Sequence, residues 1–177
     1  MNRLRLATLW LDGCSGCHMS LLDMDERLLD LAGRLDIVYS PLVDRKEFPE
    51  AVDVTCVEGA VSSHDDERLV RLVRARTRLL VAIGDCAVTG NVPALRNSLG
   101  ADRMLQSVYV DRPVLHPGVP RQDLPRLHER VLPLHAVVRV DLFLPGCPPP
   151  AGTIHAALVA LCGGHRPDPP LASRFGA

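Results

Sequence analysis

A chain of 177 residues with 47% hydrophobic residues is long enough to bury one well-packed core, so we expect a single domain over residues 1–177. A formal net charge of -1 gives no basic surface for nucleic acid, and no window approaches the roughly 18 apolar residues that a membrane helix requires. A strand pattern occupies the position where a signal peptide would stand, so we expect a cytoplasmic protein. In that reducing compartment, its six cysteines are expected to serve metal binding or redox chemistry rather than disulfides.

Strand-like apolar runs and helical spacing alternate along the first hundred residues. The predicted elements, in chain order, are a strand at 4–11, a helix from Cys17 to Gly33, strands at 35–43 and 51–57, a helix after Ser62 and Ser63, a strand at 78–83 and a short helical segment towards Ser98. Acidic residues three positions after Ser62 and Ser63 indicate a capping box, which supports that helix start.

The pattern changes at residues 99–133, where five prolines follow residue 112. We interpret this segment as a long functional or interface loop with a helical turn or two within 124–132. A strand at 137–144 and a helix at 151–162 complete the predicted elements. The predicted core therefore spans about residues 4–162, and residues 163–177 are expected to form a tail.

Alternating strands and helices predict an α/β fold with a mostly parallel sheet and helices on both faces. Ligands bind such sheets at the carboxyl edge of the strands. Four cysteines follow predicted strands in glycine-containing turns: Cys14, Cys17, Cys86 and Cys147. Because three remote segments deliver four thiols to one edge, the sequence predicts a four-cysteine metal site.

Several chemistries could use these thiols. A thioredoxin-like redox pair needs only Cys14 and Cys17 and would leave the other two unexplained. Structural zinc also accepts four cysteines but usually pairs two short knuckles, so the spacing favours an iron-sulfur cluster without excluding zinc. We expect Cys56 and Cys162 to be small buried hydrophobic residues.

Few other side chains indicate a role in the site. Gly16 and Glu58 are candidates for residues that contact the cysteine ligands rather than the metal itself, although Glu58 could equally be a capping or surface residue. We expect His18 to be solvated or to cap its helix. No catalytic residue is predicted, because nothing resembles a Ser-His-Asp arrangement, a phosphate loop or a dinucleotide-binding signature.

Four ordered segments resemble the signature of nickel-iron hydrogenase small subunits. They are Asp12-Gly13-Cys14-Ser15-Gly16-Cys17, Val57-Glu58-Gly59-Ala60, Gly84-Asp85-Cys86-Ala87 and Pro145-Gly146-Cys147-Pro148-Pro149. The resemblance implies a flavodoxin-like domain whose four matching cysteines bind the 4Fe-4S cluster nearest the active site, and it favours iron-sulfur over zinc. A flavin is not expected on this chain, because two cysteines fill the turn where a flavodoxin binds phosphate.

The departures from that family pattern refine the expectation. Larger members carry a further domain with two more clusters, so we expect one cluster here. The short, leaderless form resembles the small subunits of cytosolic bidirectional, NAD-reducing hydrogenases. Expected partners are therefore a large subunit with the nickel-iron centre and diaphorase subunits with FMN and iron-sulfur clusters. The related subunit of respiratory complex I has adjacent cysteines where this chain has Cys14 and Cys17, although other hydrogenase branches and a complex-I-like role remain open.

Overall fold

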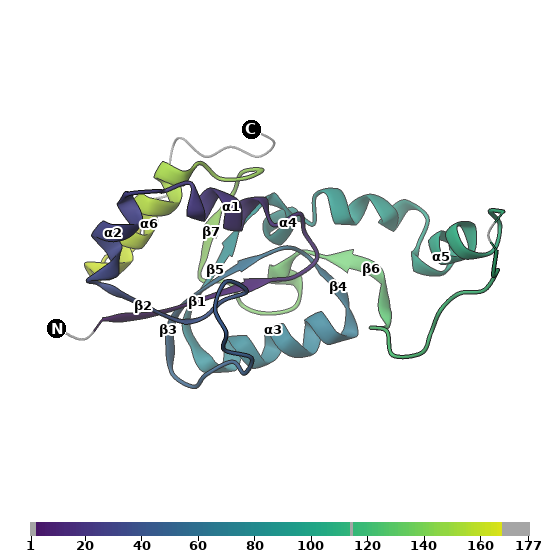
Figure 1. The fold of residues 1–177 in the computed structure, drawn as a ribbon, viewed down its shortest axis with the longest axis horizontal. Coiled ribbons are helices and arrows are strands. Elements are labelled where there is room, and N and C mark those ends of the chain that lie inside the picture. Colours follow the sequence, from purple (N-terminus) through teal and green to yellow (C-terminus); the bar gives the residue numbers. More distant parts are fainter. Residues whose placement is uncertain (1–2, 114, 168–177) are drawn as a thin grey trace.

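A five-stranded parallel sheet forms the centre of the computed structural model, which describes residues 3–113 and 115–167 (Figure 1). The strands lie in the order β2 (Leu35–Tyr39), β1 (Leu4–Trp10), β3 (Val52–Glu58), β5 (Thr77–Ile83) and β7 (Leu142–Leu144). Trp10 pairs with Glu58, and Glu58 pairs with Ile83, so three strands end level with one another. The predicted parallel α/β sheet is confirmed, and its carboxyl edge is a defined place for a site.

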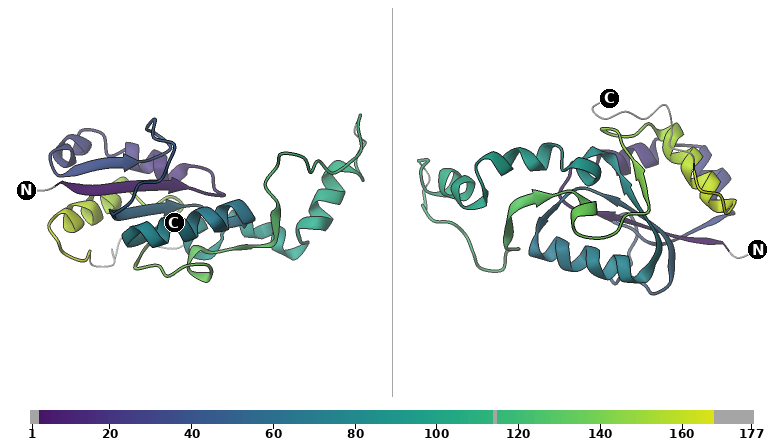
Figure 2. Two further views of the ribbon diagram at one scale, coloured as in Figure 1. Left: turned by 90° about the horizontal axis from the view of Figure 1, so that it is seen from below. Right: turned by 180° about the vertical axis from the view of Figure 1, so that it is seen from behind.

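Helices cover both faces of the sheet (Figure 2). One core joins the sheet to α1 (Gly16–Leu22), α2 (Arg27–Ala32) and α6 (Ala151–Cys162). The second core joins it to α3 (His64–Arg76), α4 (Gly84–Thr89) and the 3-10 helix η2 (Leu134–Ala136). Successive strand residues such as Leu6 and Ala7 enter opposite cores, as the period of two in a strand requires.

Three predicted elements differ in their extent. The strand expected at 35–43 ends at Tyr39. The single helix expected from Cys17 to Gly33 is broken after Leu22, and the chain turns through Asp25, whose φ of 51° is incompatible with a continuing right-handed helix. The strand expected at 137–144 is limited to Leu142–Leu144. The chain forms the 3-10 helix η2 just before this stretch and joins the sheet only at Leu142. The helix predicted at 151–162 is confirmed.

The segment expected to be an irregular loop contains regular structure. After the 3-10 helix η1 (Val92–Ser98), α5 (Ala101–Tyr109) lies on an extension that projects away from the central sheet (Figures 1 and 2). The helical turns predicted at 124–132 are wrong, because Leu127–Leu132 forms β6 and pairs antiparallel with β4 (Val61–Ser63). We call residues 99–113 and 115–126 the arm.

The described residues end at Pro167, so most of the predicted tail at 163–177 lies outside them, and the single domain over 1–177 stays a prediction. None of the described helices combines the length and the apolar character that a membrane crossing requires.

Candidate metal centre

The four predicted cysteines come together at the carboxyl edge of the sheet. Cys14 and Cys17 lie between β1 and α1, Cys86 lies in α4 directly after β5, and Cys147 follows β7. Burial raises the pKa of Cys17 above its ordinary value, and negative charge on Glu58 and on the other three cysteines raises it further. Each thiol is therefore close enough to Cys17 for its charge to act there.

The turns that carry the cysteines are fixed to one another by hydrogen bonds. The N–H of Asp85 donates to the carbonyl of Gly146 at 2.8 Å, and the N–H of Gly146 donates to Asp85 Oδ1 at 2.7 Å. The hydroxyl of Ser20 in α1 donates to the carbonyl of Pro149 at 2.5 Å. These hydrogen bonds hold the three cysteine-bearing turns in place relative to one another.

The space beside two of the sulfur atoms is narrow where glycines pass them. Gly84 has a φ of +81°, and a Cβ atom placed on it would lie 2.2 Å from Cys17 Sγ. A Cβ atom on Gly16 would lie 3.2 Å from Cys14 Sγ. The backbone at Gly84 and Gly16 therefore passes close to two of the four thiols. Glycine allows this close approach of the backbone to a bound group.

Polar hydrogens point at three of the sulfur atoms. The N–H of Gly16 donates to Cys14 Sγ at 3.4 Å, and the side-chain amide of Asn91 donates to Cys147 Sγ at 3.5 Å. Burial raises the pKa of Cys86 to about 11, together with the charges of Cys14, Cys147 and Glu58, while the N–H of Val92 donates to its sulfur and acts in the opposite direction. Four soft sulfur donors with N–H bonds to sulfur fit an iron-sulfur cluster.

Glu58 lies behind the site and is 2% exposed. Its carboxylate accepts the N–H groups of Cys17 at 3.3 Å and His18 at 2.9 Å, which are the first free donors of α1. His18 Nδ1 lies 2.5 Å from Glu58 Oε2, and His18 Nε2 lies 3.0 Å from Thr8 Oγ1. The expectation of a solvated His18 is wrong, because this buried network holds its ring at both nitrogens.

The remaining two cysteines lie within secondary-structure elements and not in the turns of this edge. Cys56 is 3% exposed in β3, and burial raises the pKa of its thiol to about 12, as expected for a small hydrophobic residue. Cys162 ends α6 and packs against the same core, where burial raises the pKa of its thiol. Neither contributes to the four-cysteine site.

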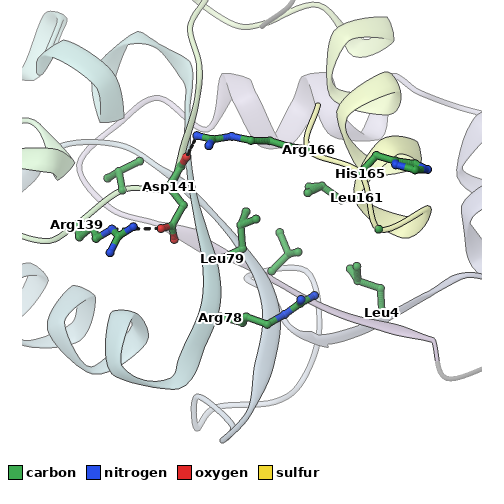
Figure 3. Close-up of a pocket in the computed structure, with 11 residues that line it drawn as sticks. Leu4, Arg78, Leu79, Arg139, Asp141, Leu161, His165 and Arg166 are labelled. Carbon is green, nitrogen blue, oxygen red and sulfur yellow. Dashed lines mark hydrogen bonds and ion pairs between the residues drawn. The ribbon is translucent and has the colours of Figure 1, made fainter. Parts of the chain in front are cut away.

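A cavity of about 450 Å³ lies at the opposite edge of the sheet, where β1 and β5 begin (Figure 3). Leu4, Leu79 and Leu161 form its apolar part, and Arg78 and Arg139 lie around it. None of the described residues that line this cavity is a cysteine, so it is separate from the four-cysteine edge.

Comparison with known proteins places the chain in a family. The pattern of the family described as "NADH ubiquinone oxidoreductase, 20 Kd subunit" matches residues 14–161, which include all four clustered cysteines. The chain belongs to this family. Within the 20 Kd subunit family, a structure of an NAD+-reducing [NiFe]-hydrogenase in the H2-reduced state is similar at 42% identity and a TM-score of 0.93, covering 98% of this chain and 99% of that one.

Two curated relatives in the family are hydrogenase subunits. The chain is 40% identical to the delta subunit of the NAD-reducing hydrogenase HoxS of Cupriavidus necator, over 96% of its own length and 83% of that protein. It is 38% identical to a subunit of the F420-non-reducing hydrogenase vhu of Methanocaldococcus jannaschii, over 94% of its own length but only 58% of that protein. The resemblance to nickel-iron hydrogenase small subunits is confirmed, and the chain spans little more than half of the archaeal relative.

Sequence reasoning missed two parts of this site. The side-chain amide of Asn91, just before η1, and the backbone N–H of Val92, at the start of η1, reach the sulfurs, and no motif marks them. The bond between Glu58 and His18 joins residues 40 positions apart, which only the pairing of β1 with β3 brings together.

Proposed function

We propose that this chain is the electron-transfer subunit of a soluble NAD-reducing nickel-iron hydrogenase and that Cys14, Cys17, Cys86 and Cys147 hold one 4Fe-4S cluster. The observation that carries the proposal is the convergence of four thiols from three remote turns on one edge of the sheet. The names of the NAD-reducing relatives, matched over most of their length, support the complex in which it would act.

When bound, a 4Fe-4S cluster accepts and gives up one electron at a time. The chain's own residues would set its properties. The four thiolates supply negative charge, and N–H groups from Gly16, Asn91 and Val92 offset part of it. Cys17 is buried whereas Cys14 and Cys147 are exposed, so the exposed side of the site is where a redox partner would approach.

Hydrogen itself would be cleaved on a partner subunit. The nickel site of the family requires two CxxC pairs, and this sequence has one, so we assign no catalytic residue to this chain. The partners we propose are a large subunit with the nickel-iron centre and diaphorase subunits with FMN and iron-sulfur clusters. We place the complex in the cytoplasm, where reducing conditions keep the cysteines available as ligands.

The first experiment is to measure iron and acid-labile sulfide in the anaerobically purified chain and to record an electron paramagnetic resonance spectrum after reduction. We expect about four irons and four sulfides per chain and a reduced-cluster signal. Cys86→Ser and Cys147→Ser should each lose the cluster, whereas Cys162→Ser, outside the site, should keep it. About one zinc without sulfide would contradict the proposal and favour a structural zinc module.

The electron acceptor is tested on the assembled complex. The archaeal relative is named as part of a hydrogenase that does not reduce F420, so a different hydrogenase branch is the second candidate. Hydrogen-dependent reduction of NAD+ by the complex, lost when its small subunit carries Cys86→Ser, would support the NAD-reducing assignment. An active hydrogenase that reduces viologen dyes but never NAD+ would favour the other branch.

A further inference from the structure

A second group of metal-ligating side chains lies where α3 meets β6. His64 and Glu67 are the first and fourth residues of α3, and His128 is the second residue of β6. One ring nitrogen from each histidine and one carboxylate oxygen of Glu67 all lie within 4.8 Å of one another. None of the three residues belongs to the turns that carry the cysteines, so this group is distinct from the four-cysteine centre.

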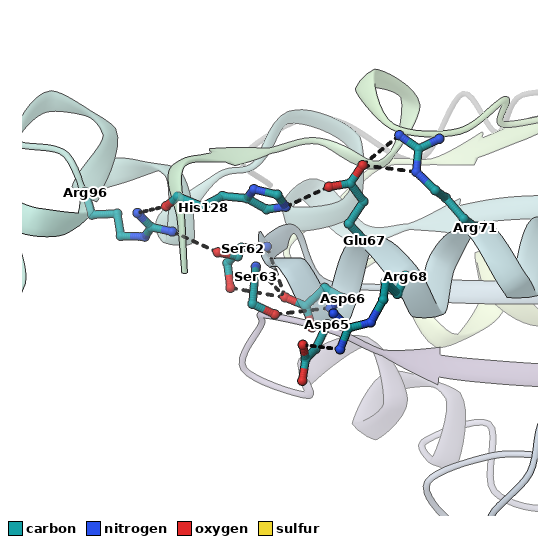
Figure 4. Close-up of polar contacts among 9 residues, drawn as sticks. All are labelled: Ser62, Ser63, Asp65, Asp66, Glu67, Arg68, Arg71, Arg96 and His128. Carbon is teal, nitrogen blue, oxygen red and sulfur yellow. Dashed lines mark hydrogen bonds and ion pairs between the residues drawn. The ribbon is translucent and has the colours of Figure 1, made fainter. Parts of the chain in front are cut away.

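The ring of His128 points its Nε2 atom at the Glu67 carboxylate, at ion-pair distance but outside hydrogen-bond geometry. Nε2 lies 3.1 Å from Glu67 Oε2 (Figure 4), and it is a buried atom without hydrogen-bond geometry to any group in residues 3–113 and 115–167. The rings of His64 and His128 lie 4.3 Å apart at an interplanar angle of 53°. An ion-pair contact without hydrogen-bond geometry satisfies a buried nitrogen only in part, and a metal ion shared with Glu67 and His64 would satisfy it fully.

The surrounding residues hold the three side chains in place. Arg71 donates to Glu67 Oε1 from Nε at 3.0 Å and from Nη2 at 2.7 Å, which leaves Oε2 directed at His128. Arg96 Nη1 donates to the carbonyl of His128 at 3.0 Å, and the N–H of His64 donates to the carbonyl of Arg126 at 3.0 Å. Metal-binding carboxylates are commonly held by such an outer hydrogen bond.

We propose that His64, Glu67 and His128 bind a divalent transition-metal ion, for which Zn²⁺ is the best match. Two imidazole nitrogens and one carboxylate oxygen are ligands that Zn²⁺ accepts with a further position open, whereas Mg²⁺ and Ca²⁺ prefer oxygen alone. Ligand atoms around tetrahedral Zn²⁺ lie roughly 3.3–3.6 Å apart. The His128–Glu67 separation of 3.1 Å is close to that value, and small side-chain rotations would bring the third ligand to it.

The ion would connect two segments that are remote in sequence. β6 is the strand by which the chain returns from the arm, and within the described residues it pairs with the three-residue β4 alone. A metal ion bound by residues of both α3 and β6 would hold β6 against the helix. Because the two histidines are 64 positions apart, the binding free energy would become stability of the folded segment.

The test uses the full chain purified anaerobically with its iron, so that the four cysteines are occupied. Equilibrium dialysis against Zn²⁺, followed by elemental analysis, should show one zinc per chain without loss of iron, and Zn²⁺ should raise the melting temperature. Glu67→Gln and His128→Ala should each weaken zinc binding at least about tenfold. His116→Ala removes an exposed histidine of the arm and should bind zinc as the unchanged chain does.

Three results would overturn the proposal. They are no zinc binding to the iron-loaded chain, equal zinc affinity in Glu67→Gln and His128→Ala to that of the unchanged chain, and zinc uptake only in proportion to lost iron, which would place it on the cysteines. Iron content also reports whether each variant is folded. Glu67→Gln keeps the shape of the side chain, so it tests the site even if His128→Ala misfolds. An anomalous difference peak between the three side chains in zinc-soaked crystals would locate the ion.

Discussion

At Gly84 the backbone after β5 passes directly beside the sulfur of Cys17. A methyl group there would lie 2.2 Å from that sulfur, and the φ of +81° adds about 1–2 kcal/mol of strain for any other residue. We expect Gly84→Ala to lose most of the iron and sulfide bound by the unchanged chain. Gly33→Ala is the control, since Gly33 has a φ of -78° and no atom within 4 Å of the added carbon. Equal iron content in both variants would show that the missing side chain at Gly84 is not required for the cluster to bind.

Glu58 offers a second test on a single side chain. Glu58→Ala leaves two buried N–H groups of α1 and the ring of His18 without their acceptor. Each orphaned donor costs about 1–3 kcal/mol, so the melting temperature should fall by roughly 5 °C or more. Glu58→Gln keeps one oxygen acceptor and should lose less. Thermal unfolding followed by circular dichroism measures both, with the exposed Glu47→Ala expected to melt like the unchanged chain.

The residues of the site differ in how far the sequence could predict them. The cysteines were predictable, because each follows an apolar strand and parallel strands align their carboxyl ends. The burial of His18 was not, because its partners Thr8 and Glu58 meet it only through the pairing of β1 with β3. Whether the four cysteines are ligands stays a prediction that metal analysis decides.

Elements with strong local patterns were predicted well, and those that depend on distant pairing were not. The capping box of α3, in which Ser63 and Asp66 exchange hydrogen bonds, is visible in the sequence and confirmed. β6 was missed because the strand it pairs with among the described residues is the three-residue β4, more than sixty positions earlier. Five prolines around it obscured any strand pattern. The segment of α5 stands just before these prolines and was therefore interpreted as part of the same loop.

Asp141 joins three elements and should make stability depend on pH. Burial alone raises the pKa of its carboxyl, but the N–H of Leu80 at 2.8 Å and Arg74 at 2.5 Å outweigh it and hold the pKa below its ordinary value of 3.8. A lowered folded pKa means that this stabilisation is present above 3.8 and is lost as the pH falls through the folded value.

Asp141→Asn should therefore lower the free energy of unfolding at pH 7 by about 1–3 kcal/mol. The difference from the unchanged chain should shrink as the pH falls below about 3.8, where the carboxyl of the unfolded chain takes up its proton, and it should vanish once the native carboxyl is protonated as well. Denaturant unfolding at several pH values measures both. A difference that stays constant down to about pH 2 would show that the carboxylate charge is not responsible. Asp44→Asn, at an exposed loop position, is the control.

At the scale of the whole molecule, the surface beside the cysteines carries several exposed apolar side chains. Trp10 is 48% exposed and Met19 is 55% exposed next to the motif of Cys14 and Cys17. Along η1, which follows the helix of Cys86, Val92 and Leu95 are 62% and 72% exposed and lie on one side of the 3-10 helix. Exposed apolar surface of this kind marks protein interfaces, and an electron-transfer site needs a partner close to its cluster.

Leu95→Asp tests whether this surface binds the large subunit that we propose as the partner. Burying a new carboxylate in an interface is costly, so we expect at least about a tenfold loss of affinity, about 1.4 kcal/mol, in co-purification or binding measurements. The control is Leu29→Asp on α2, because Leu29 is 75% exposed but lies away from the cysteine turns. Iron content should be unchanged in both, since both side chains are largely exposed. If Leu29→Asp weakens assembly and Leu95→Asp does not, the large subunit binds the α2 side, and electrons would have to cross the domain to reach it.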